Sequence, residues 1–161
     1  MSKTKMPQII NLLWSGPEKI NSDNFKEAFK DKKGIYQIYG THPIYGRNVL
    51  LYIGRTNVSF KTRLEKHDLD WIIYEYDEVQ IYTGEIVNDE GVPQDDPESI
   101  INAESLLIYF SAPAYNSQGL IELKKGEDVI LLNFGKIGSI PCEVSTFWYN
   151  SNIWNTFTKK R

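Results

Sequence analysis

The sequence predicts an α+β fold in a single domain, with an antiparallel or mixed sheet that carries helices on its faces. Short runs rich in β-branched and aromatic residues alternate with segments that begin at helix-capping residues. The first two runs are close enough to pair as a hairpin, and a helix and a third run follow them. The length of 161 residues, with 41% hydrophobic residues, suits one domain with its own core.

The N-terminal half predicts a helix and a hairpin. Asn21, Ser22 and Asp23 provide capping side chains for a short helix, which ends at Lys33-Gly34. Residues 35–39 and 49–53 have strand composition, and the segment between them contains Pro43 and Gly46, as expected of a loop or long turn.

The C-terminal half predicts two helices and two further strands. Asn57 and Ser59 can cap a helix that runs to about His67, and residues 79–83 read as a strand. Asp96-Pro97 begins a helix that runs to about residue 110. Residues 129–134 read as a strand near the C-terminus.

Composition excludes several classes of protein. Cys142 is the single cysteine, so an internal disulfide is impossible, and no Cys/His pair has the spacing of a zinc site. No window approaches the ~20 apolar residues of a membrane helix, and residues 9–14 are too short for a signal-peptide core. We therefore expect a soluble, cytoplasmic protein without a membrane partner.

Charge is unevenly distributed along the chain, whose net charge is −3. Residues 26–67 contain nine basic and three acidic side chains, for a net +6, whereas residues 68–104 contain twelve acidic and no basic ones. Each block could simply be a solvated face. Phosphate binding needs local rather than global positive charge, so the +6 segment is where a nucleic-acid backbone would dock.

Glu104 is the first candidate for chemistry. Its neighbours three and four positions away on the predicted helix are Ile100, Ile101, Leu107 and Ile108, so the carboxylate interrupts an apolar stripe. Such a carboxylate needs a basic partner, a raised pKa or a metal ion. An internal salt bridge and a functional site remain equally open from position alone.

Arg63 and His67 are the second candidates, because a spacing of four places them on one helix face. Arginine binds phosphate with two parallel hydrogen bonds, and histidine can move a proton near neutral pH. Tyr36 and Tyr52 lie on the two strands of the predicted hairpin. Taken singly, each of these residues is more often a surface or packing residue.

Taken together, the candidates resemble the GIY-YIG nuclease superfamily. Gly34-Ile35-Tyr36 and Tyr52-Ile53-Gly54 are similar to its two defining triplets. Further positions that resemble the family's motif are Arg55, Arg63, His67, Glu104 and Asn116. The longer gap between the two tyrosines, with the loop at residues 41–48, and the acidic stretch before Glu104 depart from the family pattern.

The resemblance implies a small three-stranded antiparallel sheet flanked by helices, with an additional C-terminal strand and loop segment. Residues 1–161 would form one nuclease domain with its motif core at 34–116. An N-terminal helix within residues 1–33 and a C-terminal extension at 119–161 would pack on that core.

The resemblance also implies a mechanism for hydrolysing phosphodiester bonds in DNA. Tyr36, with Tyr52 beside it, would activate or position the water, and Arg55 and His67 would lower the tyrosine pKa or relay its proton. Arg63 would clamp the scissile phosphate. Glu104 would hold a single Mg²⁺ or Mn²⁺, and Asn116 would hold a site group by hydrogen bonding.

We expect the substrate to be double-stranded DNA and the enzyme to be a compact restriction-like or general endonuclease. Because one site cuts one strand, a double-strand break would need a homodimer or two sequential events. Two alternatives remain: a non-catalytic module that binds nucleic acid or protein on the same fold, and an unrelated interaction protein that uses the acidic block.

Overall fold

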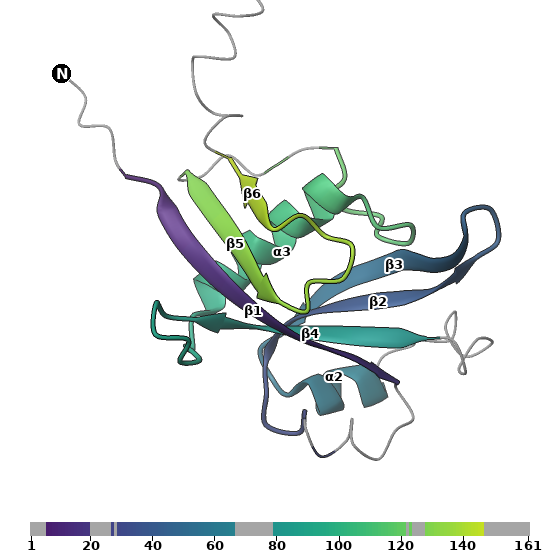
Figure 1. Cartoon of the computed structure of the whole chain (residues 1–161), viewed down its shortest axis with the longest axis horizontal. Helices are drawn as coiled ribbons and strands as arrows, with labels where there is room; N and C mark the ends of the chain where they lie inside the picture. Colours follow the sequence, from purple (N-terminus) through teal and green to yellow (C-terminus); the bar gives the residue numbers. More distant parts are fainter. Residues whose placement is uncertain are drawn as a thin grey trace, which may run out of the picture.

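The computed structural model describes residues 6–19, 27, 29–66, 79–121, 123 and 128–146, with the backbone alone at 65 and 66. Its main feature is a curled six-stranded sheet in the order β3-β2-β4-β1-β5-β6 (Figure 1). The elements are β1 (Gln8–Lys19), β2 (Gly34–His42), β3 (Gly46–Thr56), α2 (Phe60–Lys66), β4 (Gln80–Val87), α3 (Pro97–Ser111), β5 (Val129–Gly135) and β6 (Glu143–Ser145).

The prediction of a small three-stranded antiparallel sheet flanked by helices is wrong. The sheet has six strands and is mixed, because β1 pairs parallel with β5 and antiparallel with β4. The part of the chain that the structure describes is mostly β, with α2 and α3 as its two named helices. Segments outside the motif core, expected to pack against the sheet, instead provide three of its strands.

The strand β1 explains most of this error. Its buried residues Ile10, Leu12 and Trp14 alternate with Ile9 and Leu13, which are exposed but also apolar. The alternation of apolar and polar residues that marks a half-buried strand is therefore lost. Gly16-Pro17, which resembles a turn, lies inside the strand where the pairing with β4 shifts register between Ser15 and Glu18.

Several local predictions are confirmed. The strands expected at 35–39 and 49–53 lie within β2 and β3, and that at 129–134 lies within β5. The strand expected at 79–83 is β4, which begins at Gln80 and continues to Val87. The helix expected from Asp96 is α3, in which Asp96 Oδ1 accepts a hydrogen bond from Ser99 N at 3.1 Å. The predicted helix before Gly34 falls largely outside the described residues, and so does His67.

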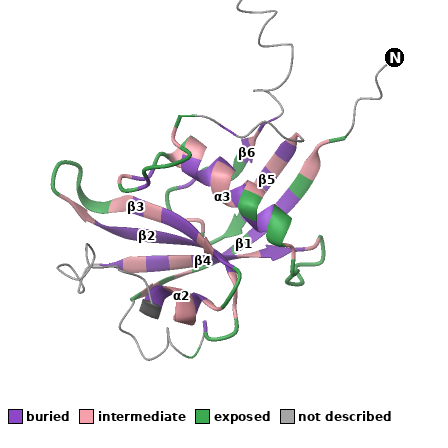
Figure 2. Ribbon diagram, turned by 180° about the vertical axis from the view of Figure 1, so that it is seen from behind, coloured by how far each residue is buried: buried purple, intermediate pink, exposed green. Residues whose placement is uncertain are grey.

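The buried side chains form a separate cluster on each face of the sheet. One cluster joins α3 to β1, β5 and the neighbouring strands, with Leu12, Leu107 and Leu131 fully buried. The other lies beneath α2 and includes Tyr36, Ile38 and Phe60. Figure 2 shows buried residues running along the strands and exposed ones at the connecting turns. Helices α2 and α3 therefore cover opposite faces, and the edge strand β3 borders both.

Candidate active site

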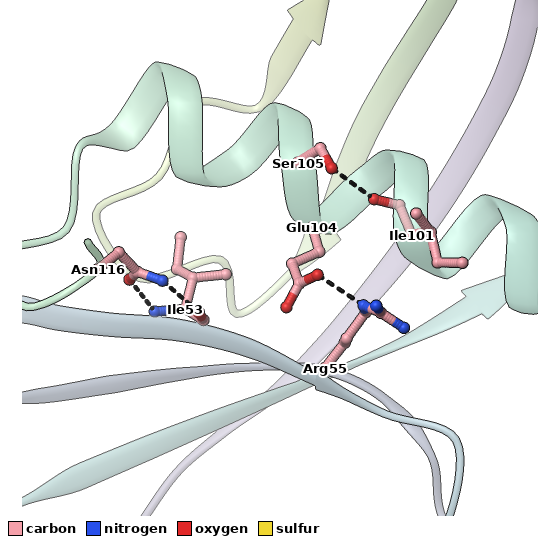
Figure 3. A network of polar contacts seen from close by, with 6 residues as sticks. All are labelled: Ile53, Arg55, Ile101, Glu104, Ser105 and Asn116. Carbon is pink, nitrogen blue, oxygen red and sulfur yellow. Dashed lines mark hydrogen bonds and ion pairs between the residues drawn. The ribbon is translucent and has the colours of Figure 1, made fainter. Parts of the chain in front are cut away.

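Glu104 lies in the middle of α3 and forms an ion pair with Arg55 of β3. Glu104 Oε2 accepts a hydrogen bond from Arg55 Nε at 2.7 Å, and the second carboxylate oxygen points away from the guanidinium (Figure 3). The Glu104 side chain is 20% exposed. Burial raises the pKa of Glu104, whereas the hydrogen bond and charge of Arg55, and the charge of Arg63, act to lower it.

The two motif tyrosines lie side by side on the α2 face of the sheet. Tyr36 on β2 pairs with Gly54 on β3, and the Tyr36 and Tyr52 ring centroids are 6.1 Å apart. A Cβ atom at Gly54 would lie 2.5 Å from the Tyr36 hydroxyl and 2.6 Å from the Tyr52 ring. Only glycine at this position lets the two phenols approach each other. This explains why the triplet Tyr52-Ile53-Gly54 ends in glycine.

Arg63 of α2 links the tyrosines electrostatically to Glu104. Burial raises the pKa of Tyr36 to about 12, and the charge of Tyr52 adds to this, whereas Arg63 acts in the opposite direction. Burial and then Glu104 raise the pKa of Tyr52, which Arg63 again lowers. Among the described residues, neither the Tyr36 hydroxyl nor Arg63 Nε has a hydrogen-bond partner of good geometry, although both are buried. Buried polar atoms of this kind are rare and often mark functional sites.

A cavity of about 330 Å³ opens at the outer edge of β3, between this strand and α3. It is lined by Tyr52, Arg55, Ile101, Glu104, Ser105, Ile108, Tyr115, Asn116, Ser117, Gln118 and Gly119. Ser105 donates its hydroxyl proton to Ile101 O at 3.0 Å (Figure 3), so it is bonded within its own helix. Tyr36 and Arg63 do not line the cavity and lie behind Tyr52 on the α2 side.

Asn116 fixes the backbone of β3 beside the cavity. Its Oδ1 accepts a hydrogen bond from Ile53 N, and its Nδ2 donates one to Ile53 O, each at 2.9 Å (Figure 3). The amide therefore bridges both backbone groups of the residue between Tyr52 and Gly54. Asn116 therefore holds the β3 backbone next to Tyr52.

The structure thus brings together six of the seven residues selected from the sequence, and the seventh, His67, lies outside the described residues. Around the cavity are Tyr52, Arg55, Glu104 and Asn116, with Tyr36 and Arg63 behind them. Sequence reasoning missed Tyr115, although it precedes Asn116 in the motif. Nothing in the sequence distinguished Ser117 and Gln118, because nothing local reveals that their loop faces α3.

The predicted phosphate-binding segment is partly neutralised by the acidic segment that follows it. Lys32 pairs with Glu85 at 2.9 Å and Lys33 pairs with Asp95 at 2.6 Å, in addition to the pair of Arg55 with Glu104. Much of the net +6 charge of residues 26–67 is therefore paired with acidic side chains of residues 68–104. The positive charge that acts on both tyrosines is that of Arg63 on α2.

The donor set at Glu104 suits a divalent cation that keeps most of its waters. Mg²⁺ commonly binds through one or two carboxylates together with substrate phosphates. No cluster of three or more His, Cys, Asp or Glu side chains exists within the described ranges, so they provide no closed metal cage. A carboxylate at an open cavity, with one oxygen that is not paired with the guanidinium, fits a cation bound jointly by protein, water and substrate.

Comparison of the chain with protein-family models, curated proteins and solved structures finds no match. Membership of the GIY-YIG superfamily therefore stays a prediction from the motif residues. In the part of the chain that the structure describes, neither helix is long and apolar enough to cross a membrane.

Proposed function

We propose that this protein hydrolyses phosphodiester bonds in DNA with the help of one divalent cation at Glu104. The observation that carries the proposal is the position of Glu104: a partly buried carboxylate with a raised pKa, at an open cavity, beside two arginines and two phenols. Keeping such a carboxylate ionised works against stability, and clusters of this kind concentrate at functional sites.

Each side chain has a role that follows from its position. Arg55 orients the Glu104 carboxylate through the 2.7 Å ion pair. Tyr52 faces the cavity, where its hydroxyl can position a water molecule beside a bound phosphate. Arg63 supplies positive charge behind the phenols, which would offset the negative charge that Glu104 and a bound phosphate bring to the site. When bound, the cation would neutralise charge on the phosphate and on the leaving oxygen.

Tyr36 would act as a hydrogen-bond donor behind Tyr52. With a pKa of about 12, its hydroxyl keeps its proton at neutral pH and cannot serve as a base. Asn116 would be a positioning residue, because its hydrogen bonds hold the β3 backbone next to Tyr52.

The test is nicking of supercoiled plasmid DNA with Mg²⁺, and with EDTA as control. We expect Glu104→Gln to lower the rate on the order of a hundredfold or more, since the change removes the sole acidic ligand assigned to the ion. Glu98→Gln, in the first turn of the same helix, is the matched control and should cut at the normal rate. Cleavage that persists in EDTA, or in Glu104→Gln, would overturn the proposal.

The Arg55–Glu104 ion pair also favours a second candidate, a non-catalytic module that binds nucleic acid. The pair occupies one carboxylate oxygen and gives Glu104 a structural partner. In this case the protein would retain a labelled DNA at low salt but would not cut it with either Mg²⁺ or Mn²⁺.

A further inference from the structure

The turn between β2 and β3 holds a pair of stacked aromatic rings. The His42 and Tyr45 ring centroids are 4.5 Å apart with 20° between the planes. His42 Nδ1 accepts hydrogen bonds from the backbone N–H groups of Ile44 at 3.1 Å and Tyr45 at 3.2 Å. Figure 1 shows that this hairpin extends beyond the body of the sheet. The stack is therefore built into the turn, although Tyr45 is 69% exposed.

The stack continues from the hairpin to the candidate active site. The Tyr115 ring centroid lies 5.3 Å from that of His42, at an angle of 42°. Tyr115 lines the same cavity as Glu104 and Tyr52, and its backbone N–H donates to Leu51 O at 2.8 Å. A row of three rings, Tyr45, His42 and Tyr115, thus leads from the exposed turn to the rim of the cavity. We call this row the aromatic platform.

We propose that the aromatic platform binds an unpaired nucleobase of the DNA strand whose phosphate occupies the cavity, so that the preferred substrate is unpaired DNA. This inference rests on the proposed function and narrows the double-stranded substrate expected from the sequence. A base in an intact duplex has both faces stacked on its neighbours, whereas an unpaired base offers a free face to an aromatic ring.

Charge and exposure favour a nucleotide over a protein as the occupant. The segment from residue 41 to residue 51 contains Arg47 and no acidic residue, so a phosphate backbone meets no repulsion there. The platform adjoins a cavity whose single carboxylate is Glu104. Single-strand binding sites combine aromatic rings with positive charge along the path of the backbone, and the hairpin contains the exposed Tyr45 together with Arg47.

The experiment measures affinity in EDTA by fluorescence anisotropy, with a labelled 12-nucleotide single strand and with a blunt hairpin duplex of the same strand sequence. We expect the single strand to bind more tightly than the duplex. Tyr45→Ala should weaken single-strand binding about tenfold, the size of one lost base–aromatic stack, whereas Tyr45→Phe should retain it. Ile44→Ala is the matched control, because Ile44 is on the same turn and is 82% exposed but has no ring.

A second readout tests stacking directly. The fluorescence of 2-aminopurine in the single strand should be quenched by the wild-type protein and by Ile44→Ala, but not by Tyr45→Ala. Equal affinity for both DNAs, or equal effects of Tyr45→Ala and Ile44→Ala, would overturn the inference. So would protein self-association that Tyr45→Ala abolishes.

The two proposals fail in different ways. Tyr45-dependent binding of the single strand without metal-dependent cleavage of either the single strand or the plasmid would leave the aromatic platform standing and remove the hydrolase. Metal-dependent cleavage of duplex and single strand at equal rates would retain the hydrolase and remove the platform.

Discussion

Tyr36 is a buried phenol whose surroundings keep it protonated. With its pKa raised to about 12 by burial, only about one molecule in 10⁵ would be ionised at neutral pH. From the sequence we expected Arg55 to lower the pKa of this tyrosine. In the structure, Arg55 instead forms an ion pair with Glu104. The cation that acts on the phenols is Arg63. Residue types could be read from the sequence, but the pairing among them depended on the fold.

At Glu104, burial and ionisation oppose each other. Its pKa in the folded state is raised above the ordinary value by burial. The folded state therefore holds the proton more tightly than the unfolded chain, and ionisation costs stability as pH rises through the folded-state pKa. A residue selected for stability alone would be apolar here, like its neighbours Ile100 and Leu107.

The first prediction concerns Arg55→Gln. Arg55 lowers the pKa of Glu104 by hydrogen bonding and by charge, so removing the cation should raise that pKa further. The side-chain carboxyl ¹³C resonance of Glu104, followed by NMR against pH, should titrate at higher pH in Arg55→Gln than in the wild type. If nicking requires the carboxylate, the acid limb of its pH profile should move in the same direction.

Lys33→Gln is the control for this titration, because it removes a cation that pairs with Asp95 and not with Glu104. It should leave the Glu104 resonance titrating as in the wild type. A Glu104 midpoint that is unchanged or lower in Arg55→Gln would contradict the assigned ion pair.

At the scale of elements, the edge of β3 is protected by the segment that follows α3. Ala114 N and Tyr115 N donate to Leu50 O at 3.2 Å and Leu51 O at 2.8 Å, and Asn116 then bonds both backbone groups of Ile53. An uncovered edge strand can pair with other chains. The segment after α3 therefore prevents such pairing at β3, and it also forms one wall of the cavity. The sequence predicted that this helix ends near residue 110, but not that the chain then returns along β3.

The second prediction is that Asn116→Ala lowers the free energy of unfolding by about 2–3 kcal/mol, since it removes two hydrogen bonds and leaves buried backbone groups at Ile53 without partners. Urea denaturation followed by circular dichroism measures this change. Ser117→Ala, at the exposed neighbouring position, should lie within about 0.5 kcal/mol of the wild type. Equal effects of the two substitutions would mean that Asn116 does not tether the strand.

Individual elements were more predictable than their arrangement. Helix α3 could be read from its Asp96-Pro97 start, and β2 to β4 from their composition, because those features are local. The six-stranded sheet that joins them could not be predicted from the sequence. Strand β1 pairs parallel with β5, whose residues lie far along the chain, and no turn sequence connects the two strands.

At the scale of the molecule, β1 joins the two halves of the sheet. Leu12 pairs with Ile86 of β4 on one side and with Asn133 of β5 on the other, and it is fully buried. The motif strands β2, β3 and β4 lie on one side of β1, while β5 and β6 lie on the other. Without β1 the two groups would share no backbone ladder, so we expect them to fold as one unit through it.

The third prediction follows from this arrangement. Leu12→Ala should lower the free energy of unfolding by about 3 kcal/mol, the typical effect of a cavity at a fully buried leucine. Leu13→Ala is the matched control: the adjacent side chain lies on the opposite face and is 40% exposed, so its loss should cost under about 1 kcal/mol. Hydrogen exchange should show the amides of β2 and β5 losing protection together in Leu12→Ala. Exchange that speeds up in β5 and β6 while β2 to β4 keep their protection would mean that the motif half is stable without β1.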